Sequence, residues 1–233
     1  WNKAQEDIDG YFSQLVTMDC EFINSKMIPK LEGTSGEERL TMINDILARM
    51  IKAKCLKEPK FLELSKELAA TEPTFSRVSF LYKAYLGKDD LENATIYINK
   101  AIELAETDKD RADVTITRAK LKRSQGAYGA ARSDYMSALK YDASKAYEAY
   151  TAIGDMYLSS GNSCKGTDAS NPVHKKAIYI AAYNYYVKAG NSAKAATAQR
   201  YFPSKEEIFT HSMGGQQVNT GCWVGETVTI PSL

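Results

Sequence analysis

A short pattern of small and large residues recurs along the chain and constrains its fold more than any other feature. An alanine is followed four residues later by an isoleucine or tyrosine, and three residues after that by another alanine. On a helix these positions share one face. The small residue lets a neighbouring helix approach closely, and the large residue fills the groove beside it. The copies are Ala94, Ile98 and Ala101; Ala131, Tyr135 and Ala138; and Ala182, Tyr186 and Ala189.

A second apolar segment precedes each copy, which predicts pairs of helices. Turn signals separate the two segments, namely "GKDD" in the first copy, Gly126 in the second and Gly161 in the third. Neither helix of a pair buries its apolar stripe alone, so such units stack side by side. We expect antiparallel helix pairs over residues 76–105, 112–141 and 147–190, with no strand in these spans. An ordinary helical bundle with coincidental alanines is the alternative.

These residues resemble the tetratricopeptide repeat, whose pattern is Leu-Gly-x-x-Tyr, then Gly, then Ala-x-x-x-Phe-x-x-Ala. The third copy carries Gly154 and Tyr157 at the matching positions, whereas the second departs from the pattern with Arg118 and Lys122. The resemblance implies an all-α solenoid of antiparallel helix pairs. We expect an N-terminal helical region (1–72) with helices at 3–28, 37–54 and 59–71, the repeats (73–202), and a C-terminal capping tail (203–233).

The tail differs in chemistry from the rest of the chain. Its last segment, "TGCWVGETVTI", alternates β-branched residues and predicts a short strand. Ahead of it, "SKEE" predicts a capped helical turn, and "SMGGQQVNTG" predicts a loop. The last helix of a solenoid leaves an apolar face that must be covered, and we expect the tail to cover it.

The four cysteines are spaced as expected for disulfides rather than for a metal site. None forms a C-x-x-C pair, and only His174 and His211 can assist a metal, so we expect no metal. Cys164 lies in a long polar turn and Cys222 in the tail, so a bond between them can hold the tail in place. Cys20 then pairs with Cys55, and we expect Trp223 to pack beside the first link against the last helix, with its indole N–H donating to a carbonyl. Four buried thiols are the alternative.

The tail makes the resemblance more specific, because it points to one group within the tetratricopeptide-repeat proteins. A helical repeat followed by "YFP-S-KEEIF" and "GCW-x-x-E-T" is similar to exported tetratricopeptide-repeat proteins of Gram-negative gut and oral anaerobes, over roughly residues 74–233. The resemblance implies a periplasmic or outer-envelope location and supplies no catalytic residues. The chain starts at Trp1 rather than Met, which indicates a processed or shortened chain.

Charge and motifs exclude several classes of function. Thirty basic and 29 acidic residues give a net charge of +1, which does not favour nucleic acid or an anionic membrane as partner. No segment is apolar enough to span a membrane, so the chain is peripheral to one at most. We find no phosphate-binding loop or nucleophile motif and expect neither catalysis nor a cofactor. A thiol–imidazole pair of Cys222 and His211 is a minor alternative.

A candidate binding surface follows from aligning the repeats. If they stack as in the family, the first helix of each pair lines a concave face that carries Ser79, Lys83, Ile116, Lys120, Arg123, Thr151 and Asp155. A solvated charged face is the simpler interpretation. The functional interpretation is a basic groove for an extended peptide or a carboxylate-bearing ligand. We therefore expect a non-enzymatic scaffold for a protein or peptide partner. The tyrosines of the C-terminal half, chiefly core residues, leave carbohydrate or nutrient capture in an aromatic groove as the alternative.

Overall fold

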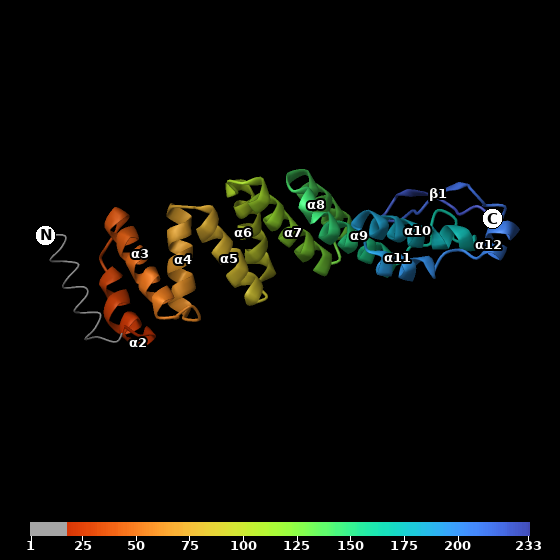
Figure 1. Ribbon diagram of the computed structural model, residues 1–233. Helices are drawn as coiled ribbons and strands as arrows, with labels where there is room; N and C mark the ends of the chain where they lie inside the picture. The colour runs from red at the N-terminus through yellow and green to blue at the C-terminus, as the bar shows by residue number, and fades with distance from the viewer. Residues whose placement is uncertain (1–17) are drawn as a thin grey trace. The chain divides into compact units, whose positions relative to one another are not determined.

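Helices make up most of the chain, and a two-stranded antiparallel sheet lies near its C-terminus (Figure 1). The computed structural model describes residues 18–233. Packing divides the chain into two units, one ending at Lys100 and the other beginning at Ala101. The predicted all-α class with a short C-terminal β segment is confirmed, and the stacking of helix pairs into a solenoid stays a prediction.

The elements follow the predicted spans closely. In the first unit they are α2 (Cys20–Phe22), the π-helix η1 (Ile23–Met27), the 3-10 helix η2 (Ile28–Leu31), α3 (Gly36–Lys52), α4 (Pro59–Thr71) and α5 (Phe75–Gly87). Helix α6 (Leu91–Leu104) spans the boundary. In the second unit they are α7 (Asp108–Ser124), α8 (Tyr128–Tyr141), η3 (Ala143–Lys145), α9 (Ala146–Ser160), α10 (Pro172–Ala189), α11 (Ser192–Gln199), α12 (Lys205–Thr210), β1 (Gln217–Asn219) and β2 (Thr227–Thr229). Each of the spans 76–105, 112–141 and 147–190 holds two helices and no strand.

The first unit is built on the apolar faces of α3 and α4. Ile43 and Met50, seven residues apart on one face of α3, are fully buried with Phe61 of α4. The disulfide between Cys20 and Cys55 joins the start of α2 to the turn between α3 and α4, with Cα atoms 5.6 Å apart. A continuous helix over 3–28 is not observed where the structure can test it. Residues 3–17 lie outside the described part. From residue 20 the chain forms three short consecutive helical segments, the last of which contains Pro29 near its start and ends at Leu31.

Close contact between α9 and α10 explains why one repeat position is glycine. A Cβ atom built on Gly154 would lie 2.6 Å from Cε1 of the Tyr186 ring, and that ring is fully buried. Tyr186 is the large residue of the third copy of the repeat. Its ring occupies the space that any side chain at position 154 would need, so the glycine lets the two helices meet face to face.

We predict that Gly154→Ala destabilises the second unit although alanine is the better helix former. The overpacking against Tyr186 costs about 1–3 kcal/mol, more than the roughly 0.5–1 kcal/mol that alanine gains in a helix. Gly129 in α8 has no atom near its Cβ position, so Gly129→Ala should be neutral or stabilising. Urea unfolding followed by Trp223 fluorescence, in a Trp1→Phe background, measures both. Equal behaviour of the two variants would contradict the packing argument.

The second copy of the repeat replaces its expected apolar residues with cations, and the structure shows how they are accommodated. Asp134 of α8 is 5% exposed. Its carboxylate accepts two hydrogen bonds from the Arg118 guanidinium, both at 2.8 Å, and lies 2.7 Å from Nζ of Lys122. Here an ion-paired cluster joins α7 to α8 in place of the Leu-Gly and Tyr contacts.

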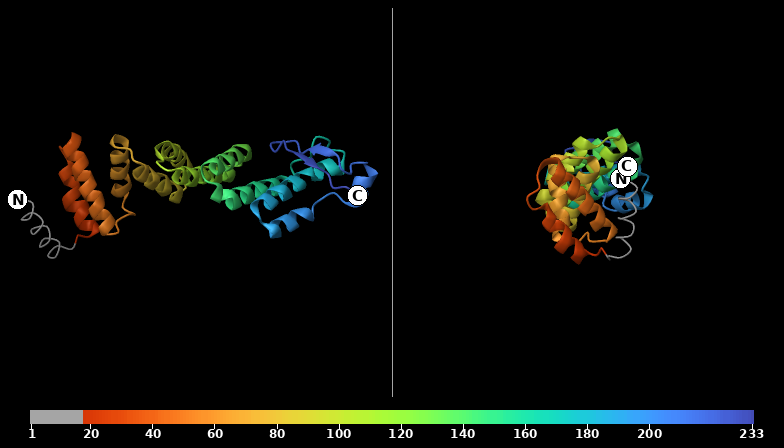
Figure 2. Two further views of the ribbon diagram at one scale, coloured as in Figure 1. Left: turned by 45° about the horizontal axis from the view of Figure 1, so that its top comes forward. Right: turned by 90° about the vertical axis from the view of Figure 1, so that its left-hand side faces the viewer.

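The tail folds onto the second unit as a β-hairpin-like flap alongside α10 (Figure 2). Strand β1 pairs antiparallel with β2, with Val218 opposite Val228. Both valines, together with Val224 and Ile230, are buried in the same core as α9 and α10. The prediction of a loop over "SMGGQQVNTG" is wrong at residues 217–219, because β1 forms there by pairing with β2. The capping box at Ser204 and Glu207, predicted from "SKEE", starts α12 as expected.

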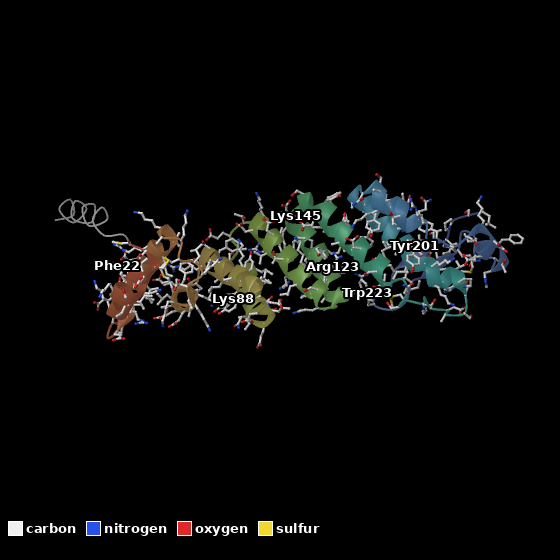
Figure 3. All side chains as sticks on the ribbon, turned by 90° about the horizontal axis from the view of Figure 1, so that it is seen from below. Phe22, Lys88, Arg123, Lys145, Tyr201 and Trp223 are labelled. Atoms are coloured by element: carbon white, nitrogen blue, oxygen red, sulfur yellow. A yellow bond between two sulfur atoms is a disulfide. The ribbon has the colours of Figure 1, made fainter. Side chains whose placement is uncertain are left out.

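The structure pairs Cys164 with Cys222, and their Cα atoms lie 5.7 Å apart. A chain with two disulfides matures in an oxidising compartment, which places it outside the cytosol. The bond removes the free thiol that a pair with His211 requires. Trp223 (labelled in Figure 3) directly follows Cys222, and its ring packs against Tyr128 of α8 and Tyr157 of α9 rather than against the last helix. Its indole N–H donates to the Ser160 hydroxyl at 3.2 Å rather than to a carbonyl.

Glu226 attaches the tail to three helices of the second unit through its carboxylate. One of its carboxylate oxygens accepts hydrogen bonds from the hydroxyls of Tyr157 at 2.6 Å and Tyr185 at 2.8 Å. The same oxygen lies 3.3 Å from Nη1 of Arg132, which also donates to the Val224 carbonyl at 2.7 Å. Burial, and then the bond to Glu226, raises the pKa of Tyr185 to about 12 and raises that of Tyr157 further. Both hydroxyls therefore stay protonated donors at neutral pH.

We predict that Glu226→Ala lowers the free energy of unfolding of the second unit by about 2–4 kcal/mol, since it leaves two buried hydroxyls without their acceptor and Arg132 without its counter-charge. Glu226→Gln keeps an acceptor oxygen and should lose clearly less. The same urea unfolding assay compares them. Identical losses in the two variants would show that the carboxylate oxygen is not what the tyrosines depend on.

Candidate binding cleft

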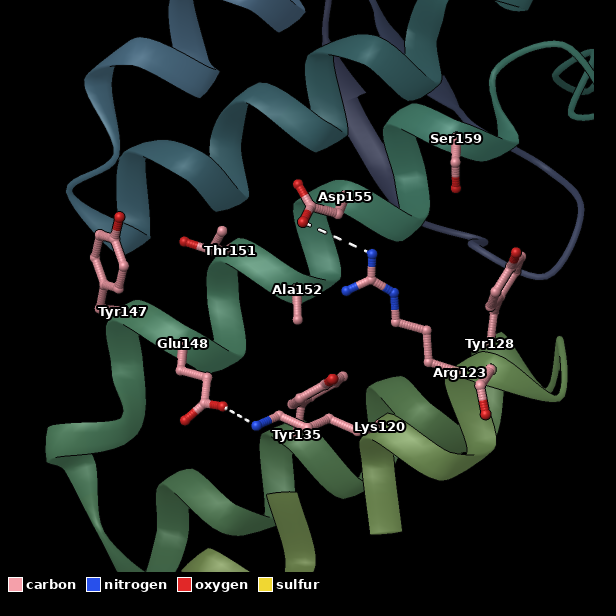
Figure 4. A pocket seen from close by; sticks show the side chains of 11 residues that line it. Lys120, Arg123, Tyr128, Tyr135, Tyr147, Glu148, Thr151, Ala152, Asp155 and Ser159 are labelled. Carbon is pink, nitrogen blue, oxygen red and sulfur yellow. Dashed lines mark ion pairs between the residues drawn. The ribbon is translucent and has the colours of Figure 1, made fainter. Parts of the chain in front are cut away.

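An open cleft of about 790 Å³ lies between α7, α8 and α9 (Figure 4). One stripe of α9 forms its long side, because Glu148, Ala152, Asp155 and Ser159 fall on a single helical face. The last turns of α7 form the opposite side. The lining residues are Lys120, Arg123, Ser124, Tyr128, Tyr135, Tyr147, Glu148, Thr151, Ala152, Asp155 and Ser159.

Two ion pairs bridge the cleft from α7 to α9 (Figure 4). Nζ of Lys120 lies 2.6 Å from Glu148, and both side chains are largely exposed, at 60% and 41%. Nη2 of Arg123 lies 3.7 Å from Asp155, which is beyond hydrogen-bond distance. An exposed pair such as Lys120–Glu148 contributes between zero and about 1 kcal/mol, and the Arg123–Asp155 pair is weakened by its length. Both cations can therefore exchange these partners for a ligand at little cost.

Asp155 is held more firmly by residues behind the cleft. Its Oδ1 accepts hydrogen bonds from Nζ of Lys194 at 2.6 Å and from the Tyr186 hydroxyl at 2.9 Å. Burial, and then the bond to Asp155, raises the pKa of Tyr186. Asp155 thus joins α9 to α10 and α11. Because its charge is already paired, we interpret it as a structural residue of the cleft wall.

Aromatic side chains form the floor and the ends of the cleft. The Tyr135 ring is buried beneath it, and burial is the main cause of the raised pKa of its hydroxyl. Tyr147 stands at one end with 61% of its surface exposed, and Tyr128 stands at the other end beside Ser159 (Figure 4). Thr151 lies between them, with a buried hydroxyl oxygen that has no hydrogen-bond partner in the described part of the chain.

The structure brings four of the seven predicted surface residues together in this cleft, namely Lys120, Arg123, Thr151 and Asp155. Ile116 does not line it, because its side chain is 3% exposed and belongs to the core of the second unit. Ser79 and Lys83 lie in the first unit. Ser79 is buried, whereas Lys83 is exposed with Nζ 5.8 Å from the centre of the Tyr82 ring.

Sequence reasoning missed one acidic residue of the lining, Glu148, and two aromatic ones, Tyr128 and Tyr135. Glu148 lies four residues before Ala152 and seven before Asp155, so extending the α9 stripe by two turns would have found it. Tyr128 and Tyr135 come from α8, the second helix of its pair. The alignment assigned only first helices to the binding face, so it gave no signal for them.

Other kinds of site are not supported in the part of the chain that the structure describes. Among residues 18–233, no three His, Cys, Asp or Glu side chains are grouped so as to hold a metal ion. None of the helices in this range is both long and apolar enough to cross a bilayer.

Comparison with known proteins adds no relative. No protein-family model matches the sequence, and no characterised protein matches it significantly. The resemblance to tetratricopeptide-repeat proteins stays a prediction that rests on the residues quoted for it.

We predict that the two carboxylates of the cleft differ in their effect on stability. Asp155→Ala should lower the free energy of unfolding by about 1–3 kcal/mol, because the buried hydroxyl of Tyr186 loses its acceptor. Glu148→Ala removes only an exposed pair and should cost less than about 1 kcal/mol. Urea unfolding followed by Trp223 fluorescence distinguishes them. A larger loss of stability for Glu148→Ala than for Asp155→Ala would contradict the conclusion that Asp155 is the structural carboxylate of the two.

Proposed function

We propose that this protein is a non-enzymatic scaffold of the cell envelope, in the periplasm or at the outer membrane, that binds an extended acidic peptide segment of a partner protein. The cleft between α7, α8 and α9 is the binding site in this proposal. The observation that carries it is the pair of exchangeable cations, Lys120 and Arg123, on one side of an open groove with an aromatic floor.

The dimensions of the groove suit a short extended segment. The α9 stripe from Glu148 to Ser159 covers eleven helical steps, or about 16 Å at 1.5 Å per residue. An extended peptide advances about 3.3 Å per residue, so about five residues fill this length. A groove open to solvent along its side accepts a segment within a longer chain, with no need for a free end.

The cations Arg123 and Lys120 favour an acidic residue in the ligand, because Asp155 has another cation as its partner. Lys194 already neutralises Asp155 at 2.6 Å, so Arg123 can turn to a ligand carboxylate without leaving an unpaired buried charge. A guanidinium binds a carboxylate through two parallel hydrogen bonds. Lys120 can leave Glu148 to water, because both are exposed.

The arrangement of polar groups supports binding rather than catalysis. Both carboxylates of the lining are engaged by cations, and they lie on the same side of the cleft. The pKa of the Tyr135 hydroxyl is raised by burial, so this group stays protonated near neutral pH and is poorly suited to exchange a proton there. Neither histidine nor a free thiol is among the lining residues.

The test compares two pools of fluorescein-labelled pentapeptides by fluorescence anisotropy. One pool has Glu at the third position and the other has Gln, with uncharged residues elsewhere. We expect the Glu pool to bind about tenfold more tightly or better, as one charge-assisted pair allows. Arg123→Gln and Lys120→Gln should each reduce the difference between the pools, while leaving the unfolding midpoint nearly unchanged.

Lys140→Gln is the matched control, since Lys140 is an exposed cation of α8 that does not line the cleft. It should leave both affinities unaltered. Equal binding of the two pools, or an equal effect of Lys140→Gln, would overturn the proposal. The exposed Tyr147 favours neutral sugars as the second candidate. Binding of maltoheptaose that is lost in Tyr147→Ala would select that function instead.

A further inference from the structure

The tail reaches the binding cleft through one aromatic contact. Ring centroids of Trp223 and Tyr128 lie 5.4 Å apart, and on its other side Trp223 meets Tyr157 edge-on at 5.3 Å. Tyr128 is the first residue of α8 and lines one end of the cleft. Trp223 itself does not line the cleft, and Tyr128 is the lining residue whose ring it contacts.

Two independent attachments fix the position of Trp223. On one side, Cys222 is bonded to Cys164, whose side chain is buried. On the other side, the Val224 carbonyl accepts a hydrogen bond of 2.7 Å from Arg132. Arg132 belongs to α8, one turn after Tyr128, so the tail is attached to the same helix whose first residue its tryptophan contacts.

The backbone at this point is shaped for close approach. Gly221 has a φ of +63°, and a Cβ atom on it would lie 2.9 Å from the carbonyl oxygen of Gly166 in the turn that carries Cys164. Cys222 follows with a φ of +44°, a conformation that costs of order 1 kcal/mol or more for a non-glycine residue. The chain adopts this conformation where it places Trp223 between Tyr128 and Tyr157.

We infer that Trp223 is a positioning residue of the binding cleft, which it completes by holding Tyr128 in place as the end wall. The part of this inference that concerns ligand affinity rests on the proposed function. The tail therefore has a second role besides covering the apolar face of α10, and the disulfide acts as the tether that keeps the tryptophan seated.

The first test needs no ligand. 3-Fluorotyrosine is placed at position 128 alone or at position 147 alone, and its ¹⁹F resonance is compared with and without Trp223→Leu. We expect the resonance at position 128 to shift by more than its linewidth or to broaden, and the one at position 147 to stay unchanged. Tyr157→Phe keeps the ring against Trp223 but removes a hydroxyl from Glu226, so it should leave position 128 unchanged while lowering stability. An unchanged resonance at position 128 in Trp223→Leu overturns the inference, whether or not any peptide binds.

The second test separates positioning from a general loss of structure by peptide length. Pentapeptides with a central Glu span the cleft to Tyr128, whereas tripeptides with a central Glu do not reach it. Trp223→Leu should weaken the pentapeptide pool about fivefold, the value of one aromatic contact, and leave the tripeptide pool unchanged. Trp223→Phe, which retains a ring, should restore most of the loss and serves if the leucine variant folds poorly. Equal weakening of the pentapeptide and tripeptide pools contradicts the inference. Failure of both pools to bind the wild-type protein refutes the proposed function. In that case the ¹⁹F resonance test still decides the role of Trp223.

Discussion

A single carboxylate oxygen organises the second unit, because Glu226 gathers donors from three helices that are otherwise distant in sequence. Arg132 comes from α8, Tyr157 from α9 and Tyr185 from α10. Each donor is at least half-buried, and without the tail the two tyrosine hydroxyls would lose their acceptor and Arg132 its counter-charge. These hydrogen bonds therefore stabilise the packing of the helices as well as the position of the tail. Glutamate suits this role, since its charge offsets the guanidinium and its oxygen accepts more than one hydrogen bond.

The same logic explains how the repeat tolerates departures from its pattern. Where the second copy carries Arg118 and Lys122, Asp134 supplies the buried counter-charge from the facing helix. A buried ion pair contributes less stability than apolar packing of equal volume, but removing one partner is costly. This site therefore fixes which face of α7 meets α8. The third copy reaches the same result by close packing, with Gly154 against Tyr186.

The local periodicity of the sequence predicted the helices. It could not predict contacts between residues that are far apart in the sequence. The alanine spacing located all three helix pairs, and "SKEE" located the start of α12, because these signals lie within a few turns of helix. Strand β1 has a single β-branched residue, Val218, and exists through pairing with β2. The bond between Tyr157 and Glu226 joins residues 69 positions apart. Ile116 was assigned to the groove since it shares a stripe with Lys120, but the core covers that stripe one turn before it reaches the cleft.

In the proposed function, the cleft is prepared for a charged ligand because its carboxylates share their counter-ions unequally. Asp155 retains Lys194 and the Tyr186 hydroxyl whichever way Arg123 points. Arg123, at 3.7 Å, is the outermost partner and gives up least when it turns away. Had Arg123 been the only cation on Asp155, its release would leave a half-buried carboxylate unpaired, at a cost that could cancel the gain from the ligand. Lys194 removes that cost, so under the proposed function the Lys194–Asp155 pair allows Arg123 to leave Asp155 for a ligand carboxylate.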